Sequence, residues 1–252
     1  KDFGDQFNKY HDISGVWGSN EILEDFVYPF DLKQIKNKSI CEVGTGSGRL
    51  LKNFLNYNPK SITAIDPADC IEIAKKNNHG KNIEYLQIDS TKMNIHDKYD
   101  YVFSIGVIHH IPDAEKAVEN IYNSLKSGGK FIMWVYGYEN NAIYVLIFNN
   151  LRRILSRLPD FIVEIFSFAF TLLTYVYIFL CKFIKLPLRK YFLKVFSKFS
   201  FKHKFYVIFD QLNPKYSKYY KKQEVLDLIQ NADFVIEDIY HKDEYSWTII
   251  GK

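Results

Sequence analysis

Short apolar segments alternate with amphipathic segments along most of the chain, a spacing that predicts βα units around a parallel sheet. The apolar runs predict strands at 39–43, 61–65, 83–88, 100–105 and 130–136. Helices are expected between most of them, at 47–57, 69–78 and 113–126. Near the C-terminus the pattern predicts a helix at 222–231 and a hairpin of two strands at 233–240 and 245–251. The chain therefore has the periodicity of an α/β domain.

Two segments depart from this alternation. Residues 1–37 are expected to form a helical cap segment, and residues 139–205 a helical, aromatic-rich insertion that divides the α/β domain into 38–138 and 206–252. An insertion that leaves the fifth strand near Gly137 starts at the carboxyl edge of the sheet. It can therefore cover a ligand bound there, with Phe7, Tyr10 and Trp17 closing the other side.

The insertion contains seventeen consecutive uncharged positions, 165–181, bounded by Glu164 and Lys182. A membrane-spanning helix needs about 20 apolar residues. A single crossing would also place strands of one sheet on opposite sides of the bilayer, so it is disfavoured. Three interpretations remain open: a buried helix of a substrate cap, an in-plane anchor at the membrane interface, and a re-entrant hairpin.

Charge is distributed unevenly over the 252 residues, whose net charge is +4. Residues 150–222 carry fifteen Lys and Arg against three acids. Such a basic, aromatic stretch, especially residues 143–205, fits an anionic membrane surface or a phosphorylated substrate, although a solvated basic face explains it as well. The three cysteines, Cys41, Cys70 and Cys181, have neither disulfide nor metal-site spacing, so no metal is expected. The N-terminus is polar, and we expect a cytoplasmic protein, peripheral at the inner membrane face where the insertion acts as an anchor.

The glycine-rich run Glu42-Val43-Gly44-Thr45-Gly46-Ser47-Gly48 lies between a predicted strand and a predicted helix. Glycines at such a turn allow positive φ and a close approach of the backbone to a ligand, while the helix N-terminus offers unpaired N–H groups. Asp66 ends the next strand, and its carboxylate can accept from both hydroxyls of a ribose. The glycines do not have the G-x-G-x-x-G spacing of a dinucleotide site.

Together these residues resemble motif I of the class I S-adenosylmethionine-dependent methyltransferases of the small-molecule type. The resemblance covers about 38–136 and 222–252, and implies a Rossmann-like sheet in which five parallel strands are completed by a sixth and by an antiparallel seventh. It also implies S-adenosylmethionine as the cofactor. For Asp89 it implies contact with the adenine amino group, whereas the local sequence fits a cap of the following turn as well. The cofactor contacts that the resemblance implies are Glu42, Gly44, Thr45, Gly46, Gly48, Asp66, Pro67, Asp89, Ser90, Ser104 and Ile105.

Two adjacent histidines follow the fourth strand, and His110 is the catalytic candidate, because a histidine near the sulfonium can act as a general base. The alternative is that the pair orients a loop. Asp210-Gln211, Pro214 and Tyr216, with Ser246-Trp247-Thr248 near the end, resemble a methyltransferase subgroup with a long insert after the fifth strand. Candidate substrate contacts are Tyr10, Trp17, His109, Asp210, Tyr216 and His241.

The sequence favours methyl transfer to a small, amphipathic acceptor from a glycan or secondary-metabolite pathway. One alternative is a membrane-associated quinone or lipid methyltransferase, and another is a non-catalytic scaffold that keeps the cofactor fold. Nucleic acid is disfavoured as a partner, because no N-P-P-Y-like motif occurs and apolar residues dominate the basic stretch. The acceptor atom and the oligomeric state are not determined by these patterns.

Overall fold

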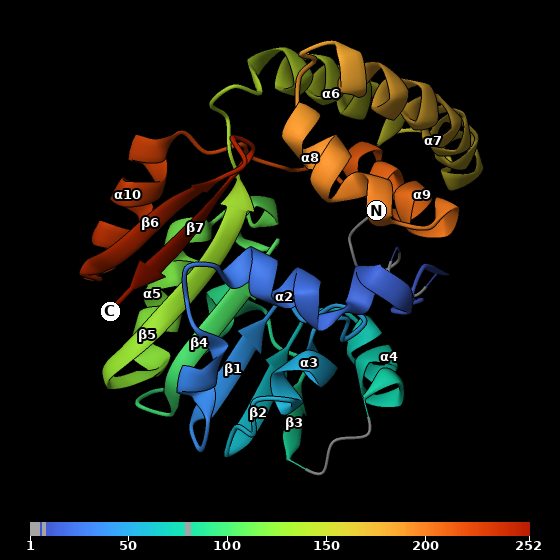
Figure 1. Cartoon of the computed structure of the whole chain (residues 1–252). Coiled ribbons are helices and arrows are strands. Elements are labelled where there is room, and N and C mark those ends of the chain that lie inside the picture. The colour runs from blue at the N-terminus through green and yellow to red at the C-terminus, as the bar shows by residue number, and fades with distance from the viewer. Residues whose placement is uncertain (1–5, 7–8, 79–81) are drawn as a thin grey trace.

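A computed structural model describes residues 6, 9–78 and 82–252. Its centre is a seven-stranded sheet of order β3-β2-β1-β4-β5-β7-β6 (Figure 1). The pairs among β1 to β5 are parallel, whereas β7 is antiparallel to both β5 and β6, as the sequence predicts. The strands are β1 (Ser39–Val43), β2 (Ser61–Ile65), β3 (Ile83–Leu86), β4 (Tyr99–Ile105), β5 (Leu125–Tyr136), β6 (Ile236–Lys242) and β7 (Ser246–Gly251).

Helices cover both faces of this sheet (Figure 1). On one face lie α2 (Asn20–Val27), α3 (Leu51–Leu55) and α4 (Cys70–Asn77), and on the other lie α5 (Ala114–Ser124) and α10 (Lys222–Gln230). Each helix buries one apolar stripe, as amphipathic helices on a sheet do. Residue Phe26 of α2, for example, packs on Trp134 of β5 at a ring distance of 4.6 Å. The N-terminal segment therefore contributes to the layers of the sheet domain as well as to the cap.

Short 3-10 helices connect several of these elements. They are η1 (Gly15–Gly18), η2 (Leu32–Ile35), η3 (Ser90–Lys92), η4 (Ile108–His110) and η5 (Phe196–Lys198). Two predicted helix or strand boundaries differ from the structure by four residues or more. The helix expected at 47–57 is regular only within α3, because the glycine-rich turn extends to Gly48 with positive φ. Strand β5 starts at Leu125 rather than 130, and its pairing with β4 skips from Leu125 to Lys130.

The insertion forms a helical cap beyond the carboxyl ends of the strands (Figure 1). It comprises α6 (Ala142–Leu155), α7 (Asp160–Phe183), α8 (Arg189–Lys194) and α9 (Phe201–Leu212), with α9 packed against both α6 and α7. The predicted boundary between 205 and 206 falls inside α9, whose continuous apolar face belongs to the cap. The cap therefore ends after Leu212, and the chain rejoins the sheet where Tyr220 bridges Gly137.

Helix α7 lies along the outside of the cap. By length and composition alone it could span a membrane, yet it forms one side of this folded cap. Its buried residues are mostly small, namely Val163, Ser167, Thr171 and Cys181. Its large apolar side chains are exposed, including Phe183 at 74%. The interpretation of this segment as a buried cap helix therefore holds only for a narrow stripe of α7, and most of its surface is exposed.

Ion pairs join the cap to the sheet domain. Two lysines of α8 contact the β6–β7 turn, with Nζ–O distances of 2.7 Å for both Lys190–Glu244 and Lys194–Asp243. Two further pairs reach the N-terminal segment, Lys198–Glu21 at 2.5 Å and Lys202–Asp12 at 2.7 Å. Part of the basic excess of the insertion is thus matched by acids of the rest of the chain. Each pair is solvent-exposed and contributes about 0–1 kcal/mol.

Candidate functional site

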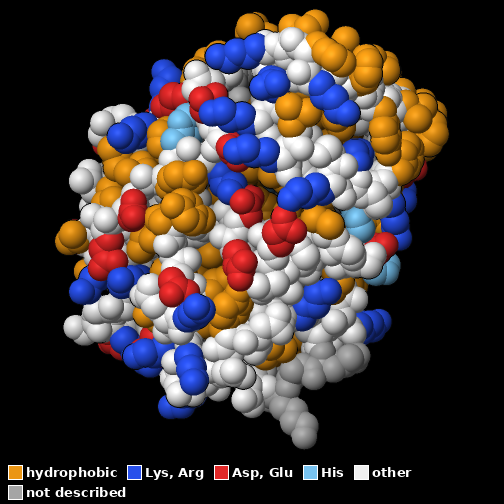
Figure 2. All heavy atoms as spheres, in the orientation of Figure 1, with side chains coloured by type: hydrophobic (Ala, Val, Ile, Leu, Met, Phe, Trp, Pro, Cys, Tyr) orange, Lys and Arg blue, Asp and Glu red, His pale blue; other side chains and the backbone are white. Residues whose placement is uncertain are grey.

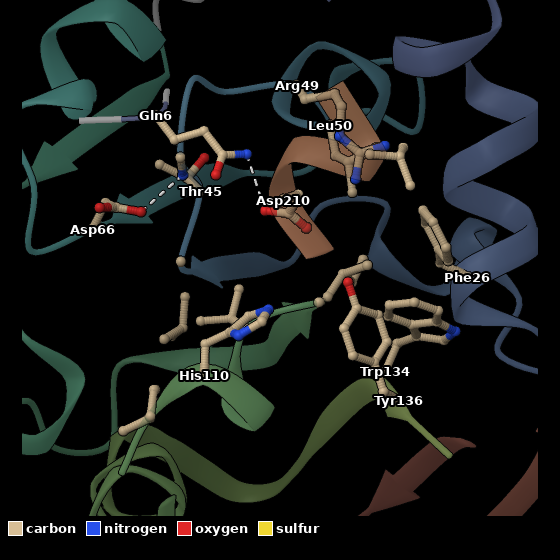
Figure 3. Close-up of a pocket in the computed structure, with 18 of the residues that line it drawn as sticks. Gln6, Phe26, Thr45, Arg49, Leu50, Asp66, His110, Trp134, Tyr136 and Asp210 are labelled. Carbon is tan, nitrogen blue, oxygen red and sulfur yellow. Dashed lines mark hydrogen bonds between the residues drawn. The ribbon is translucent and has the colours of Figure 1, made fainter. Parts of the chain in front are cut away.

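A cavity of about 660 Å³ lies between the carboxyl ends of the strands and the cap. The loops after β1, β2 and β4 form its floor, and residues of α6, α8 and α9 form its roof. In Figure 3, Asp66 and Thr45 face the cavity from one side, Asp210 from the cap, and His110 and Tyr136 from the loops and strands opposite. Ligands of open α/β sheets bind at this edge, as the sequence predicts for this chain.

The glycine-rich turn lines the cavity through residues 44–47. Gly44 has a φ of +79°, and a Cβ built on it would lie 2.3 Å from Cγ2 of Val107. A side chain at this position is therefore excluded by backbone conformation and by packing. The Thr45 hydroxyl donates to the buried Glu42 carboxylate at 2.6 Å. Burial raises the pKa of Glu42 to about 7, against the effect of this hydrogen bond and of the nearby Arg49 charge.

Two acids follow neighbouring strands at the cavity wall. The buried Asp66 accepts from the backbone N–H of Gly46 at 2.8 Å and of Ala68 at 3.0 Å (Figure 3). Asp89 accepts from the backbone N–H and the hydroxyl of Thr91 at 2.9 and 2.8 Å, and so caps η3 while also lining the cavity. The structure thus shows the cap that the local sequence fits, and contact of Asp89 with the adenine amino group stays a prediction.

The predicted cofactor residues divide into two groups. Those that line the cavity are Glu42, Gly44, Thr45, Gly46, Asp66, Pro67, Asp89, Ser90 and Ile105. Gly48 and Ser104 do not line it. The Gly48 carbonyl accepts from Asn78 Nδ2 at 2.9 Å, which joins the turn to the end of α4. The Ser104 hydroxyl donates to the Val43 carbonyl at 3.3 Å, between two central strands. These two residues support the site through hydrogen bonds to neighbouring segments.

The two histidines have different surroundings. His109 is fully buried, stacks on Tyr136 at 3.8 Å between ring centroids, and does not line the cavity. His110 lines the cavity, and its Nδ1 lies 3.2 Å from the Tyr216 carbonyl. Because a carbonyl only accepts, Nδ1 donates and Nε2 is the unprotonated nitrogen. Burial lowers the pKa of His110 to about 3, so the ring is neutral near pH 7 and a weak base.

Asp210 brings a carboxylate from α9 into the roof of the cavity (Figure 3). It accepts from Nε2 of Gln6 at 3.0 Å. Burial raises its pKa to about 6, opposed by the Gln6 hydrogen bond and by the charges of Arg152 and Arg49. Tyr10 and Trp17 line the cavity as predicted, and Tyr10 donates to Glu164 at 2.7 Å. Phe7 lies outside the described residues.

Two other predicted substrate contacts lie elsewhere. Tyr216 contributes its carbonyl to His110, but its side chain is exposed and lines a separate surface cleft. His241 lies on β6, where its ring stacks on Trp247 at 4.0 Å between centroids, and does not line the cavity. Tyr216 and His241 were predicted because they lie near motif residues in the sequence, which does not determine where their side chains point.

Several cavity residues were not predicted from the sequence. Arg49 follows the glycine-rich turn directly, stacks at 4.1 Å on the Trp17 ring and donates to the Trp17 carbonyl at 2.9 Å. Burial lowers its pKa to about 10, which leaves it charged near pH 7. Tyr136 ends β5 and accepts from Gln211 Nε2 at 2.8 Å. The rule that sites form at strand carboxyl ends could have identified Tyr136, whereas Tyr144 on α6 and Tyr191 on α8 become cavity residues only through tertiary packing.

Comparison with known proteins agrees with the domain type that the sequence motifs imply. Residues 41–133 match a family model described as a methyltransferase domain. The chain is 32% identical over 103 residues to a tRNA U34 carboxymethyltransferase of Nautilia profundicola (39% of this chain, 34% of that protein). It is 28% identical over 102 residues to a malonyl-[acyl-carrier protein] O-methyltransferase of Bacillus anthracis (40% of this chain, 38% of that protein). The chain thus spans little more than a third of the length of these relatives.

A solved structure extends the likeness to the whole fold. Human N-acetylserotonin methyltransferase in complex with SAM superposes with a TM-score of 0.58 at 17% identity, covering 99% of this chain and 56% of that chain. At this identity the likeness establishes the fold alone. The relatives named above act on different acceptors, so the match to the domain does not identify an acceptor here.

Proposed function

We infer that this chain, which carries a class I S-adenosylmethionine-dependent methyltransferase domain, transfers a methyl group from that cofactor to a small, amphipathic acceptor. The observation that carries the proposal is the convergence of the glycine-rich turn, Asp66 and Asp89 on one cavity that the cap encloses. The turn and the two acids come from three successive strand ends, whereas the roof comes from the insertion. A cofactor floor and an acceptor roof are the two parts that such a transfer requires.

The residues around the cavity floor fit this cofactor. Asp66 is buried at the end of β2, where its carboxylate can accept from a ribose diol. Glu42 and Asp89 add carboxylates that suit the positive charge and the amino groups of the ligand, and charged Arg49 suits its carboxylate. When bound, S-adenosylmethionine supplies an electrophilic methyl group on a sulfonium. The chain contributes orientation, since holding acceptor and methyl in line provides much of the acceleration.

The cap and the strand ends opposite it provide the groups that face an acceptor. Tyr144 of the cap, Tyr136 at the end of β5 and Tyr219 give the cavity aromatic surface with hydroxyl groups, which fits a molecule with an apolar body and a polar end. Asp210 is the better general base near pH 7, because its pKa of about 6 leaves it ionised and still able to take up a proton. Neutral His110, with a pKa of about 3, is assigned to orienting the acceptor through Nε2.

Cofactor binding is tested by calorimetry with S-adenosylhomocysteine on the parent chain and on Asp66→Ala. We expect at least a tenfold weaker Kd in the variant, equivalent to about 1.4 kcal/mol. Asp238→Ala, an exposed carboxylate on β6, is the matched control and is expected to bind like the parent. Equal affinity of all three proteins, or binding of NADH in place of S-adenosylhomocysteine, contradicts the proposal.

Catalysis is tested separately from binding by following tritium from labelled cofactor into an extract of the source cell. A labelled small molecule is expected with the parent chain and not with Asp66→Ala. If the chain binds S-adenosylhomocysteine but no labelled product forms under any condition, the protein acts as a scaffold and the enzymatic proposal is wrong.

A second candidate is a membrane-associated methyltransferase acting on a lipid or quinone at the inner membrane face. One observation favours it: large apolar side chains of α6 and α7 are exposed together on the outside of the cap (Figure 2). We call this the outer cap face. It comprises Ile143, Leu146, Ile147 and Ile154 of α6 and Phe161, Ile165, Phe168, Leu172, Leu173, Val176, Phe179 and Phe183 of α7. Soluble monomers rarely expose a contiguous apolar patch of this kind without a binding partner.

A further inference from the structure

A second cleft, of about 770 Å³, opens on the surface beside the cap and is lined by four basic side chains. Arg152, Arg153 and Arg157 come from the end of α6 and the turn after it, and Lys215 comes from the loop after α9. The other residues that line the cleft are Asn149, Ser156, Tyr216 and Ser217, all uncharged. The cleft therefore gathers positive charge from two separate segments with no acid in its wall.

Arg152 is the buried member of the group, 4% exposed. Its guanidinium donates to the Gln211 carbonyl at 2.9 Å, to Asn149 Oδ1 at 3.2 Å and to the Tyr219 hydroxyl at 3.3 Å. All three acceptors are neutral. A buried charge is costly to the fold unless an opposite charge compensates it. Among the described residues Arg152 forms no ion pair with a carboxylate, although its charge interacts with that of Asp210 in the roof of the cavity.

The other cations of the cleft are likewise without an acidic partner. In the part of the chain that the structure describes, Arg153, Arg157 and Lys215 form no ion pair with a carboxylate. Lysines elsewhere in the cap, such as Lys190 and Lys194, do form such pairs. The dipole of α6 favours basic residues in its last turn, but it does not explain Lys215. Like charges held together favour an anion between them.

One hydroxyl group among the residues that line the cleft, that of Ser217, makes no hydrogen bond to the described residues. Its Oγ is buried from solvent. Buried hydroxyls are normally paired, and an unpaired one costs about 1–3 kcal/mol. Because Ser217 lines the cleft, its hydroxyl can join the guanidinium groups as a donor to the oxygens of a phosphate.

We propose that this cleft is a phosphate-binding site that holds an anionic group beside the reaction cavity. The partners of Arg152 link the two sites, because Gln211 and Tyr219 line the cavity while Arg152 lines the cleft. The Tyr216 carbonyl that orients His110 belongs to the same wall. The inference that this phosphate is part of the methyl acceptor rests on the proposed function, whereas the inference that the cleft binds phosphate does not. The phosphate belongs to a soluble ester or to a lipid headgroup.

Binding is tested by calorimetry with inorganic phosphate and pyrophosphate at constant ionic strength. The test variant is Arg153→Gln/Arg157→Gln, in which both changed side chains are exposed. The matched control is Lys182→Gln/Lys185→Gln, which removes the same charge from exposed positions of the same cap. We expect the parent and the control to bind pyrophosphate within twofold of each other and the test variant at least tenfold more weakly. Ser217→Ala is expected to lower the affinity several-fold.

Two further arms identify the source of the phosphate. Glycerol 3-phosphate binding that the test variant loses assigns a soluble ester, whereas binding only to phosphatidylcholine vesicles containing phosphatidic acid, also lost in the variant, assigns a lipid headgroup. The proposal is overturned if no phosphate probe binds, or if test and control variants lose equal affinity. S-adenosylhomocysteine affinity and melting temperature, measured on the same proteins, are expected to be unchanged. A parent chain that does not bind S-adenosylhomocysteine would contradict the proposed function but not the phosphate site.

Discussion

Asp210 is the side chain whose charge state most directly links stability to the proposed chemistry. Its pKa of about 6 lies above the value of about 3.9 for an unfolded chain, so the folded protein binds this proton more tightly. The contribution of Asp210 to stability is therefore greatest below about pH 4, falls between about pH 4 and 6, and is constant above. The carboxylate opposes folding when it is ionised.

We predict that Asp210→Asn unfolds at higher denaturant concentration than the parent at pH 8. The gain in the free energy of unfolding should be about 1 kcal/mol, because the amide removes a buried charge while its oxygen can still accept from Gln6. The gain should be much smaller at pH 4, where folded Asp210 is neutral and the unfolded chain is about half protonated at this residue. Urea unfolding followed by circular dichroism at the two pH values measures this difference. A variant less stable than the parent at pH 8 would show that ionised Asp210 stabilises the fold.

The same substitution tests the assignment of the base. In the parent, methyl transfer should increase with pH with an apparent pKa near 6, and Asp210→Asn should remove this dependence and most of the rate. S-adenosylhomocysteine affinity should stay within a few-fold of the parent. A pH dependence that survives in Asp210→Asn but disappears in His110→Gln would return the role of base to His110.

Local sequence signals located the floor of the cavity and Asp210 of its roof, but not Tyr144 and Tyr191. Asp66 and Gly44 could be predicted because their roles follow from neighbours in the chain, a strand end and a turn with positive φ. His241 and Tyr216 were misplaced, because the direction of a side chain on a strand or loop depends on distant packing. Arg49 and Tyr136 were missed for the same reason, although both lie next to predicted motifs.

Among the elements, α7 has the most exposed large apolar side chains, and we therefore ask what binds them. If the outer cap face binds a membrane, the parent chain should float with vesicles that contain anionic lipid at low salt. It should bind less as salt screens the exposed Lys182 and Lys185. We predict that Leu173→Glu/Val176→Glu, at side chains 59% and 58% exposed, abolishes flotation without lowering the melting temperature.

The matched control for this experiment is Val235→Glu, at an apolar side chain 70% exposed outside the cap. It should float like the parent. Light scattering on the same proteins distinguishes the alternative partner of the outer cap face. A parent chain that ignores vesicles but forms a dimer, which the α7 substitutions dissociate, would identify a second copy of the chain as the partner and contradict membrane binding.

All strands except β5 and β6 were predicted to within two residues, because each of these is a short, largely apolar segment bounded by turns. The pattern of 61–65, for example, matches β2 to the residue. Boundaries failed where chain geometry overrode periodicity. Gly48 delays the start of α3, and the packing of α9 on α6 and α7 assigns residues 206–212 to the cap. The exposure of α7 could not be read from its sequence, since an apolar helix has the same pattern whether protein or lipid covers it.

The molecule as a whole consists of a sheet domain that carries the predicted cofactor residues and a cap that completes the cavity. Apolar packing connects the two parts, since Leu155, Phe199 and Phe209 of the cap belong to the same buried cluster as Phe26 and Trp134. Polar contacts add to this packing, including the hydrogen bond from Tyr10 to Glu164 of α7. Neither connection could be predicted from the sequence, because each joins residues far apart in the chain.

Because the sheet domain carries the predicted cofactor residues and the cap completes the cavity, we predict that the cap is required for turnover but not for cofactor binding. Replacing residues 142–217 with a short glycine-serine linker is geometrically feasible, because backbone hydrogen bonds hold the two ends of the excised segment together. The Tyr138 N–H donates to the Tyr220 carbonyl and the Tyr220 N–H donates to the Tyr136 carbonyl, both at 2.9 Å. The shortened chain should bind S-adenosylhomocysteine within a few-fold of the parent, because Asp66 and the glycine-rich turn remain. It should melt at a lower temperature, since Trp134 and Tyr245 lose their cover.

Tritium transfer into cell extract should be abolished in the shortened chain, because Asp210, Tyr144 and Tyr191 are gone and water reaches the reacting centre. The double variant Lys198→Gln/Lys202→Gln, which keeps the cap but removes two of its ion pairs, serves as the control and should retain most activity. Two results would contradict this account. Unchanged turnover after the replacement would place the acceptor outside the cap, and loss of S-adenosylhomocysteine binding would make the cap part of the cofactor site.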